Sequence, residues 1–365
     1  MFEPTSPDSY RPRRPRGRRA HRGILVGLAA VSIIAQAGLL ATGGWAAANP
    51  RAVTDAVNVA QYDPTPAIAG YATRAGMSER GRYVFYASAP RVVAGDAFDS
   101  FCSRDTPDIG VLGCFTLADA RIYLYDITNV ALADFEVVVA AHEMLHAAWY
   151  RLSIDERRAL VDPLEQAFAT IDQDSELVRR IASYEEFDPT SRIPELYAIV
   201  GTEFAEVPDI LEAHYATYFD DRAAVVTLWQ QVKALFAELE QNLDRLSSTL
   251  DELATTINAE QATAEQTAAV LEADIIVFNE RARRQGGYSN QSAFERDRQA
   301  LIDRQAALTA AIDVTTALIA EYNTLLDEFT ALNDEAEGLN RDLNINPQPI
   351  ESIEPAEPAE TIESG

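Results

Sequence analysis

The sequence predicts an α+β domain followed by a long antiparallel helical hairpin. Residues 83–86 and 121–125 are short runs rich in β-branched and aromatic residues, as expected of strands, and the glycines between them suit loops. Helical patterns dominate after the second run. From about Arg222 apolar residues, mostly leucines, recur at steps of mostly four and three, which is the spacing of a coiled-coil seam.

Length and composition limit the classes of protein that need considering. The chain has 365 residues, of which 47% are hydrophobic, so it has room for a real core and for two domains or one domain with extensions. Its formal net charge is −27. Because nucleic-acid phosphates would be repelled by such a charge, we expect no nucleic-acid partner.

The N-terminal region has the pattern of a membrane anchor. Residues 1–22 are strongly basic and residues 23–48 carry no charge. About 25 uncharged residues are enough to cross a bilayer with some tilt, and a preceding arginine cluster favours a cytoplasmic N-terminus. We therefore expect a single-pass protein of the cell membrane whose main domain is extracytoplasmic. The alternative is a signal peptide cleaved near the small residues 46–48, which would give a secreted protein.

The remaining composition shifts divide the chain further. We expect a linker over 49–78, the main domain over 79–221, a coiled-coil hairpin over 222–343 with its tip near 285–290, and a disordered acidic tail over 344–365. The leucine seam predicts that the hairpin packs on itself. A spacer, a docking arm for a coiled-coil partner and an autoinhibitory element all remain open as its role.

Helix start signals order the second half of the main domain. Ser153 and Glu156 are spaced for a capping box. Ser175 suits the N-cap of a second helix, and Pro194 and Pro208 suit the first turns of two more.

One stretch carries the pattern of a metal site. His142, Glu143 and His146 form a His-Glu-x-x-His segment inside an apolar run. Residues four apart lie on one face of a helix, so both imidazoles can point at one ion, and Glu143 is placed to hold and deprotonate a water there. Two core histidines beside a chance glutamate are the alternative. Burial of three polar side chains needs a compensating partner, however, and a zinc ion would be one.

This motif and a later glutamate resemble the gluzincin group of zinc metallopeptidases, over roughly residues 80–220. The resemblance implies a zincin-like fold for the α+β domain, peptide-bond hydrolysis with Glu143 as general base, and a third zinc ligand on a later helix. In that group the ligand commonly heads a Glu-x-x-Ala/Ser pattern. Glu195 with Ala198 matches it, although Ile199 stands where the family often has Asp.

Two other residues could supply the third zinc ligand. Glu203 lies two turns further along the same predicted helix, close to Gly201, which would permit close backbone approach. Each glutamate also has a purely structural explanation, since Glu195 lies in a first helical turn, where a carboxylate is favoured, and Glu203 could be solvated. His214 is the remaining histidine outside the N-terminal tail and is a further option.

The resemblance also implies residues that act on the substrate. A His or Tyr often lies across such sites to stabilise negative charge on the reacting oxygen, and His214, Tyr215 and Tyr218 are of the right type. A surface histidine on an amphipathic helix is the alternative for His214. An edge strand beside the active helix would bind the substrate backbone, and we expect it at residues 121–125. Tyr123 of this strand and Tyr218 are the expected substrate-binding residues.

The two cysteines, Cys102 and Cys114, lie close together in the sequence. In an exported protein such a pair predicts a disulfide. A zinc site that uses both is the alternative, but the spacing contains no Cys-x-x-Cys pair.

These features together predict a membrane-anchored, extracytoplasmic zinc metallopeptidase that acts on a protein or peptide substrate. The competing hypothesis is a catalytically inactive, metal-stabilised or metal-free domain that carries a coiled-coil scaffold or interaction arm at the cell envelope. Glu143 favours the enzyme, because a scaffold has no need of a general base.

Overall fold

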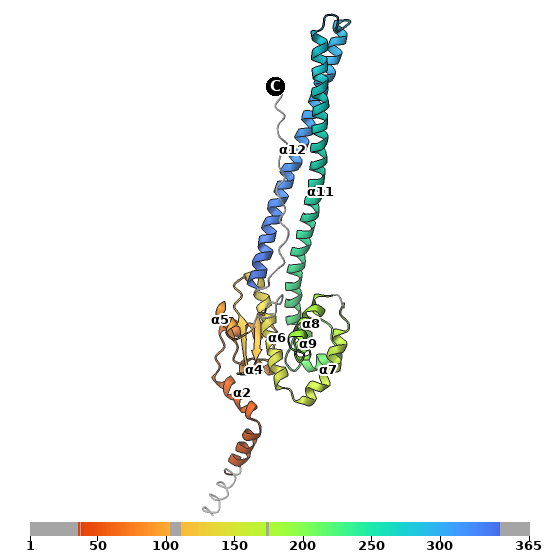
Figure 1. The fold of residues 1–365 in the computed structure, drawn as a ribbon. Coiled ribbons are helices and arrows are strands. Elements are labelled where there is room, and N and C mark those ends of the chain that lie inside the picture. The colour runs from red at the N-terminus through yellow and green to blue at the C-terminus, as the bar shows by residue number, and fades with distance from the viewer. Residues whose placement is uncertain (1–35, 37, 103–110, 173–174, 344–365) are drawn as a thin grey trace, which may run out of the picture. The chain divides into compact units, whose positions relative to one another are not determined.

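The computed structural model describes residues 36, 38–102, 111–172 and 175–343. The chain divides into two compact units between Asp63 and Pro64. Helix α2 belongs to the first unit and every later element belongs to the second. In chain order the elements are α2 (Pro50–Gln61), α3 (Pro66–Arg74), α4 (Glu79–Ala87), β1 (Arg91–Val93), α5 (Asp96–Asp99), β2 (Gly113–Thr116), β3 (Arg121–Tyr125), the 3₁₀ turn η1 (Val130–Leu132), α6 (Ala133–Arg151), α7 (Ile154–Phe168), α8 (Glu176–Phe187), α9 (Arg192–Glu203), α10 (Asp209–Tyr215), α11 (Arg222–Arg283) and α12 (Gln291–Asp342) (Figure 1).

The predicted fold class is wrong. We expected an α+β, zincin-like domain behind a transmembrane helix, whereas the described chain is mainly helical with one small three-stranded sheet. Residues 83–86, expected as a strand, belong to α4. Ser78 caps that helix by accepting a hydrogen bond from the Gly81 N–H, and Val84 and Phe85 are buried three and four residues after Gly81, which is helical spacing.

The predicted membrane segment, residues 23–48, lies largely outside the described residues, as do the predicted tails, 1–22 and 344–365. Of that segment, residues 36 and 38–48 are described and are helical. Within the described ranges, no helix combines the length and the apolar character needed to cross a bilayer.

The expected linker, residues 49–78, contains two helices instead. Pro50 is the first residue of α2, and Pro66 is the first residue of α3, which Thr65 caps through the Ile68 N–H. Proline is tolerated in a first helical turn because its missing N–H has no helical partner there. The prolines that suggested a linker therefore mark helix starts.

The sheet has the strand order β1–β3–β2, with β1 parallel and β2 antiparallel to β3. The strand predicted at residues 121–125 is confirmed, but it is the central strand and its middle residues are buried. A disulfide joins Cys102, after α5, to Cys114 in β2, with Cα atoms 5.9 Å apart. β2 is thus an edge strand tied covalently to the preceding segment.

Helix α6 is the element on which the others pack. It contacts β2 and β3 as well as α9 and α11, and in Figure 1 it lies between the sheet and α9. Its first turns are fixed by Glu136, which accepts hydrogen bonds from the Tyr71 hydroxyl at 3.0 Å and the Ile127 N–H at 3.1 Å. The capping box predicted for the next helix, α7, is confirmed at Ser153 and Glu156.

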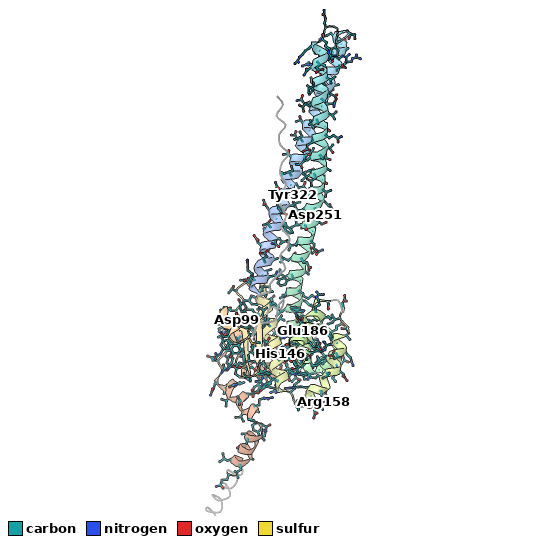
Figure 2. The ribbon with its side chains drawn as sticks, in the orientation of Figure 1. Asp99, His146, Arg158, Glu186, Asp251 and Tyr322 are labelled. Carbon is teal, nitrogen blue, oxygen red and sulfur yellow. A yellow bond between two sulfur atoms is a disulfide. The ribbon has the colours of Figure 1, made fainter. Side chains whose placement is uncertain are left out.

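Helices α11 and α12 lie side by side, and their lengths are compatible with the predicted coiled-coil hairpin (Figure 1). The chain reverses between Arg283 and Gln291, where Gly286 has a φ of 76°. Figure 2 labels Asp251 on α11 and Tyr322 on α12, and of these two side chains Tyr322 is buried. The buried core between them consists of Leu243, Leu246, Leu250, Ile257, Ile319, Tyr322 and Phe329.

Close approach of α9 to α6 depends on Gly201. A Cβ placed there would lie 2.4 Å from Cδ1 of Leu145 on α6 and 2.9 Å from Cε1 of Tyr215. Both neighbours are fully buried, so neither has room to move aside. Gly70 in α3 is a matched contrast, because a Cβ there would meet nothing within 4 Å.

We expect Gly201→Ala to lower the free energy of unfolding by about 1–3 kcal/mol, because overpacking displaces close-packed neighbours. Gly70→Ala should be neutral or stabilising by up to about 1 kcal/mol, because alanine is the better helix former. Urea denaturation followed by circular dichroism measures both. Equal destabilisation of the two variants would contradict a close α6–α9 contact at Gly201.

Candidate metal centre

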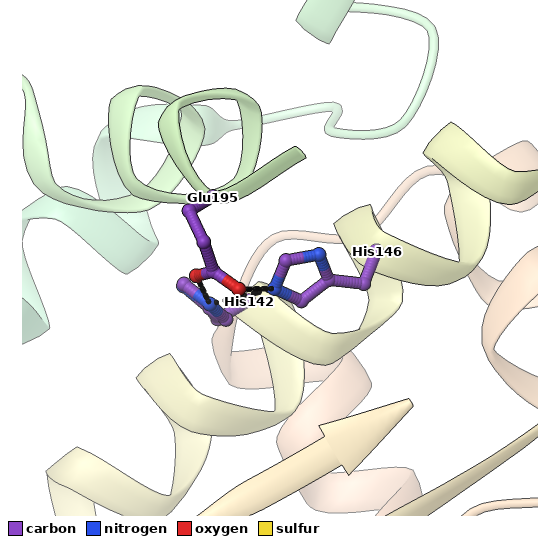
Figure 3. Close-up of side chains that lie close together, drawn as sticks. All are labelled: His142, His146 and Glu195. Atoms are coloured by element: carbon purple, nitrogen blue, oxygen red, sulfur yellow. Dashed lines mark hydrogen bonds and ion pairs between the residues drawn. The ribbon is translucent and has the colours of Figure 1, made fainter. Parts of the chain in front are cut away.

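His142 and His146 lie one turn apart on α6 and present their side chains toward α9 (Figure 3). Their Nε2 atoms are 3.0 Å apart. The spacing of four residues produces this geometry, because it returns a side chain to the same helix face.

Glu195, in the first turn and a half of α9, completes the cluster from the other helix (Figure 3). One carboxylate oxygen lies 3.5 Å from Nε2 of His142, and the other lies 3.5 Å from Nε2 of His146. The ligand atoms of these three residues all lie within 4.8 Å of one another. Two residues on α6 and one residue on α9 therefore converge on a single point.

The donor set fits a zinc ion. Tetrahedral zinc with ligand bonds of about 2.0–2.2 Å holds neighbouring ligand atoms about 3.3–3.6 Å apart. The three separations in the cluster are 3.0, 3.5 and 3.5 Å. Two imidazoles and one glutamate are also a known ligand set of catalytic zinc, one that leaves a fourth position open.

Charge and burial couple the three side chains, which are between 15% and 20% exposed. Burial raises the pKa of Glu195, but the two imidazoles outweigh it and hold that pKa well below its usual range. Burial lowers the pKa of His142. It acts the same way on His146, where the charges of Glu195 and Glu143 outweigh it and raise the pKa to about 9. The site thus holds an anionic carboxylate that requires positive charge beside it.

Glu143 extends from α6 toward β2 and is only 5% exposed. Burial raises the pKa of its carboxyl to about 7, although the Phe115 N–H donates a hydrogen bond to it. Its Oε2 atom is buried and has no hydrogen-bond partner among the described residues. Gly113 makes room for it, since a Cβ there would lie 2.8 Å from Cγ of Glu143. Glu143 is therefore confined against β2, and one of its oxygens is buried without a hydrogen-bond partner.

A cleft of about 920 Å³ contains all four residues. This volume is at the upper end of the range of small-molecule and peptide side-chain pockets. The residues that line it come from β2, α6, α7, α8, α9 and α11 and are largely apolar or aromatic. A mostly apolar cleft with a few polar groups gathered at one place is the usual form of a ligand site.

Glu203, the alternative ligand, also lines the cleft but does not join the cluster. One of its oxygens lies 2.6 Å from Nη2 of Arg180 on α8. This pairing, and not solvation, explains how a carboxylate is accommodated near the C-terminus of α9.

His214 is placed away from the cluster. Its Nε2 lies 2.9 Å from the hydroxyl of Tyr197, and Tyr215 donates a hydrogen bond from its hydroxyl to the Tyr197 carbonyl at 2.8 Å. Tyr218 is buried beside the His214 ring, with ring centroids 5.6 Å apart. None of these four residues lines the cleft. They form an aromatic group around Tyr197 of α9, away from the cleft that Glu195 lines.

The assignment of residues 121–125 as the edge strand of the site is wrong, because β3 is paired on both sides. Tyr123 points away from the cleft, stacks on Phe101 with ring centroids 4.3 Å apart, and donates a hydrogen bond to Asp119 at 2.8 Å. The edge strand along the cleft is β2, whose residues 113–115 line it.

Sequence reasoning missed several residues of the cleft. Gly113 and Phe115 belong to a strand too short to be recognised by pattern. Tyr184 lines the cleft from α8, where burial and the nearby Glu195 raise the pKa of its hydroxyl. Trp229 lines it from α11, in a region that the leucine seam marked as coiled coil. Only the fold brings these residues to the motif.

Comparisons with family models, with curated proteins and with solved structures find no match to this chain.

We expect Glu195→Gln to weaken zinc binding by more than about 100-fold, because even groups that only orient a ligand contribute about 10–100-fold. Glu203→Gln is the matched control, since it removes a nearby carboxylate that pairs with Arg180. It should change zinc affinity by less than about tenfold. Competition with a chromogenic chelator measures both affinities. If both variants lose the same factor of zinc affinity, Glu195 is not the third zinc ligand.

Proposed function

We propose that this protein is a zinc-dependent peptidase that acts outside the cytoplasm. The observation that carries the proposal is the convergence of His142, His146 and Glu195 beside a buried Glu143 in a cleft along a strand edge. The donor set suits several first-row metal ions. Of these ions we favour zinc, because the adjacent Glu143 suits metal-assisted hydrolysis.

His142, His146 and Glu195 would hold the ion. Zinc bound there would supply a Lewis acid that polarises a peptide carbonyl and acidifies water. Glu143 lies next to the first ligand in sequence, lines the cleft and has a buried oxygen without a hydrogen-bond partner. In the reaction the water oxygen bonds to the carbonyl carbon while Glu143 takes a proton from it. The C–N bond then breaks, and Glu143 gives the proton to the leaving amine.

The edge of β2 supplies a site for an extended peptide backbone. The Tyr125 N–H donates a hydrogen bond to the Leu112 carbonyl. Bonded pairs alternate along an antiparallel ladder, so Leu112 and Cys114 face β3, and the backbone groups of Gly113 and Phe115 face the cleft. The Phe115 N–H is used by Glu143. The Gly113 N–H and the carbonyls of Gly113 and Phe115 are then placed to bind a substrate strand.

Tyr184 is the residue that we propose for stabilising charge on the reacting carbonyl oxygen, in the role expected for His214. It lines the cleft from α8, and Glu195, Arg180 and Glu143 are its strongest charged neighbours. Burial raises the pKa of its hydroxyl, which therefore keeps its proton at neutral pH and can donate a hydrogen bond.

The disulfide supports a location outside the cytoplasm. Cys102 and Cys114 are joined, and such bonds form and persist mainly in oxidising compartments.

The competing function is a catalytically inactive, metal-stabilised scaffold. The length of α11 and α12, 62 and 52 residues, favours it, because so long a hairpin suits an interaction arm. The buried Glu143 favours the enzyme, because a scaffold does not require a buried carboxylate with an unpartnered oxygen in a cleft.

Glu143→Gln should leave zinc content unchanged and lower hydrolysis of a fluorescently labelled unfolded protein, such as casein, by about 10²–10⁴-fold, the usual contribution of a general base. Asp134→Asn is the control, because Asp134 is an exposed acid at the start of the same helix that does not line the cleft. It should keep the wild-type rate. If the wild type binds stoichiometric zinc but hydrolyses nothing, the scaffold is favoured. If the wild type and Glu143→Gln hydrolyse the substrate at equal rates, Glu143 is not the general base.

A further inference from the structure

The coiled-coil hairpin contributes a side chain to the cleft. Trp229 lies two turns into α11 and lines the same cleft as the metal cluster. α11 packs against both α6 and α9, the helices that carry the three ligands. The start of the hairpin is therefore part of the site.

Trp229 forms an aromatic wall with Phe135 from the first turn of α6. Their ring centroids are 5.9 Å apart. The guanidinium of Arg180 lies 5.9 Å from the centre of the Trp229 ring, and Glu203 pairs with that guanidinium at 2.6 Å. The cation at this wall is thus matched by an anion, so the wall as a whole presents aromatic surface with little net charge.

The wall lies at one end of the cleft. Phe135 packs against the buried cluster that contains Leu112, the residue before β2. The Phe115 ring instead packs with Tyr150 near the C-terminus of α6, with ring centroids 5.4 Å apart. α6 and β2 therefore run in the same direction along the cleft. Antiparallel pairing is the more stable kind, and a substrate strand antiparallel to β2 carries its carboxyl-side residues toward this wall.

The position of Trp229 is fixed on both sides along α11. At the helix start, buried Arg222 donates hydrogen bonds to the Phe204 carbonyl at 2.6 Å and to Glu212 at 2.5 Å. Further along, Leu239 packs in a buried cluster with Leu112 and Leu132. A wall held at two points is organised before a ligand arrives, which reduces the entropy lost on binding.

We propose that Trp229 and Phe135 form a specificity pocket for a bulky apolar side chain on the carboxyl side of the cleaved bond, so that the base of the hairpin selects which peptides are cut. This inference rests on the proposed peptidase function. An apolar pocket of this kind discriminates by about 10–200-fold for each methylene that it accommodates.

The first test is cleavage of a peptide pair that differs only in Phe or Ala at the carboxyl-side position. Trp229→Ala should lower kcat/KM for the Phe peptide by at least about tenfold and leave the Ala peptide within about twofold. Trp229→Phe should keep the preference. Gln230→Ala, an exposed neighbour on the same helix, should match the wild type. An unchanged preference in Trp229→Ala would overturn the pocket. A second pair, which differs in Phe or Ala only at the amino-side position, should be unaffected by Trp229→Ala, and a loss confined to that second pair would overturn the strand direction.

A second measurement separates this inference from the peptidase function. Fluorescence polarisation gives the affinity of Glu143→Gln protein for the same two peptides, labelled, without any cleavage. The Phe peptide should bind at least about tenfold more tightly than the Ala peptide, and Trp229→Ala should abolish the difference. Trp229→Leu, which keeps an apolar contact with Phe135, should reduce it. Equal binding of both peptides to the Glu143→Gln protein would overturn the pocket, whereas tight selective binding without wild-type hydrolysis would overturn only the peptidase.

Discussion

Two imidazoles and a carboxylate meet where α6 contacts α9, at the wall of the cleft, and each side chain is mostly buried. Removing such groups from water costs several kcal/mol for each charge that is left unbalanced. Glu195 remains anionic in this position because positive charge lies beside it, either on a protonated imidazole or on a cation held by both histidines. The arrangement is stable only while the two helices hold all three side chains at the same point, and this requirement organises the surrounding structure.

The close contact of α6 with α9 is produced by small residues. Gly201 allows α9 to approach Leu145, and Ala198, fully buried on α9, adds no bulk between the helices. On its other side α6 carries Glu143, and Gly113 allows the β2 backbone to approach that carboxylate. α11 packs on α6 and α9 together and supplies Trp229. The contacts of α6 with α9, β2 and α11 therefore bring the charged side chains together and also form the cleft.

The parts of the site that sequence could predict are the local ones. His142, Glu143 and His146 lie within one turn and a half of one helix, so their relation follows from helical spacing. Glu203 pairs with Arg180 of α8 and does not join the cluster, and spacing along one helix could not predict this contact between two helices. His214 and Tyr218 suited the chemistry by residue type, but they gather around Tyr197, away from the cleft.

The strand character of residues 83–86 was overridden by the Ser78 cap and by helical burial, as tertiary context often overrides propensity. The strand β2 was missed because four residues with a glycine carry almost no pattern.

We expect His142, His146 and Glu195 to bind one zinc ion together. Anomalous X-ray diffraction above and below the zinc absorption edge, from crystals of the zinc-loaded protein, tests it most directly. One strong anomalous peak should lie at bonding distance from Nε2 of both histidines and from the Glu195 carboxylate. A zinc peak at another set of residues, or a site in which Glu203 takes the place of Glu195, would contradict it.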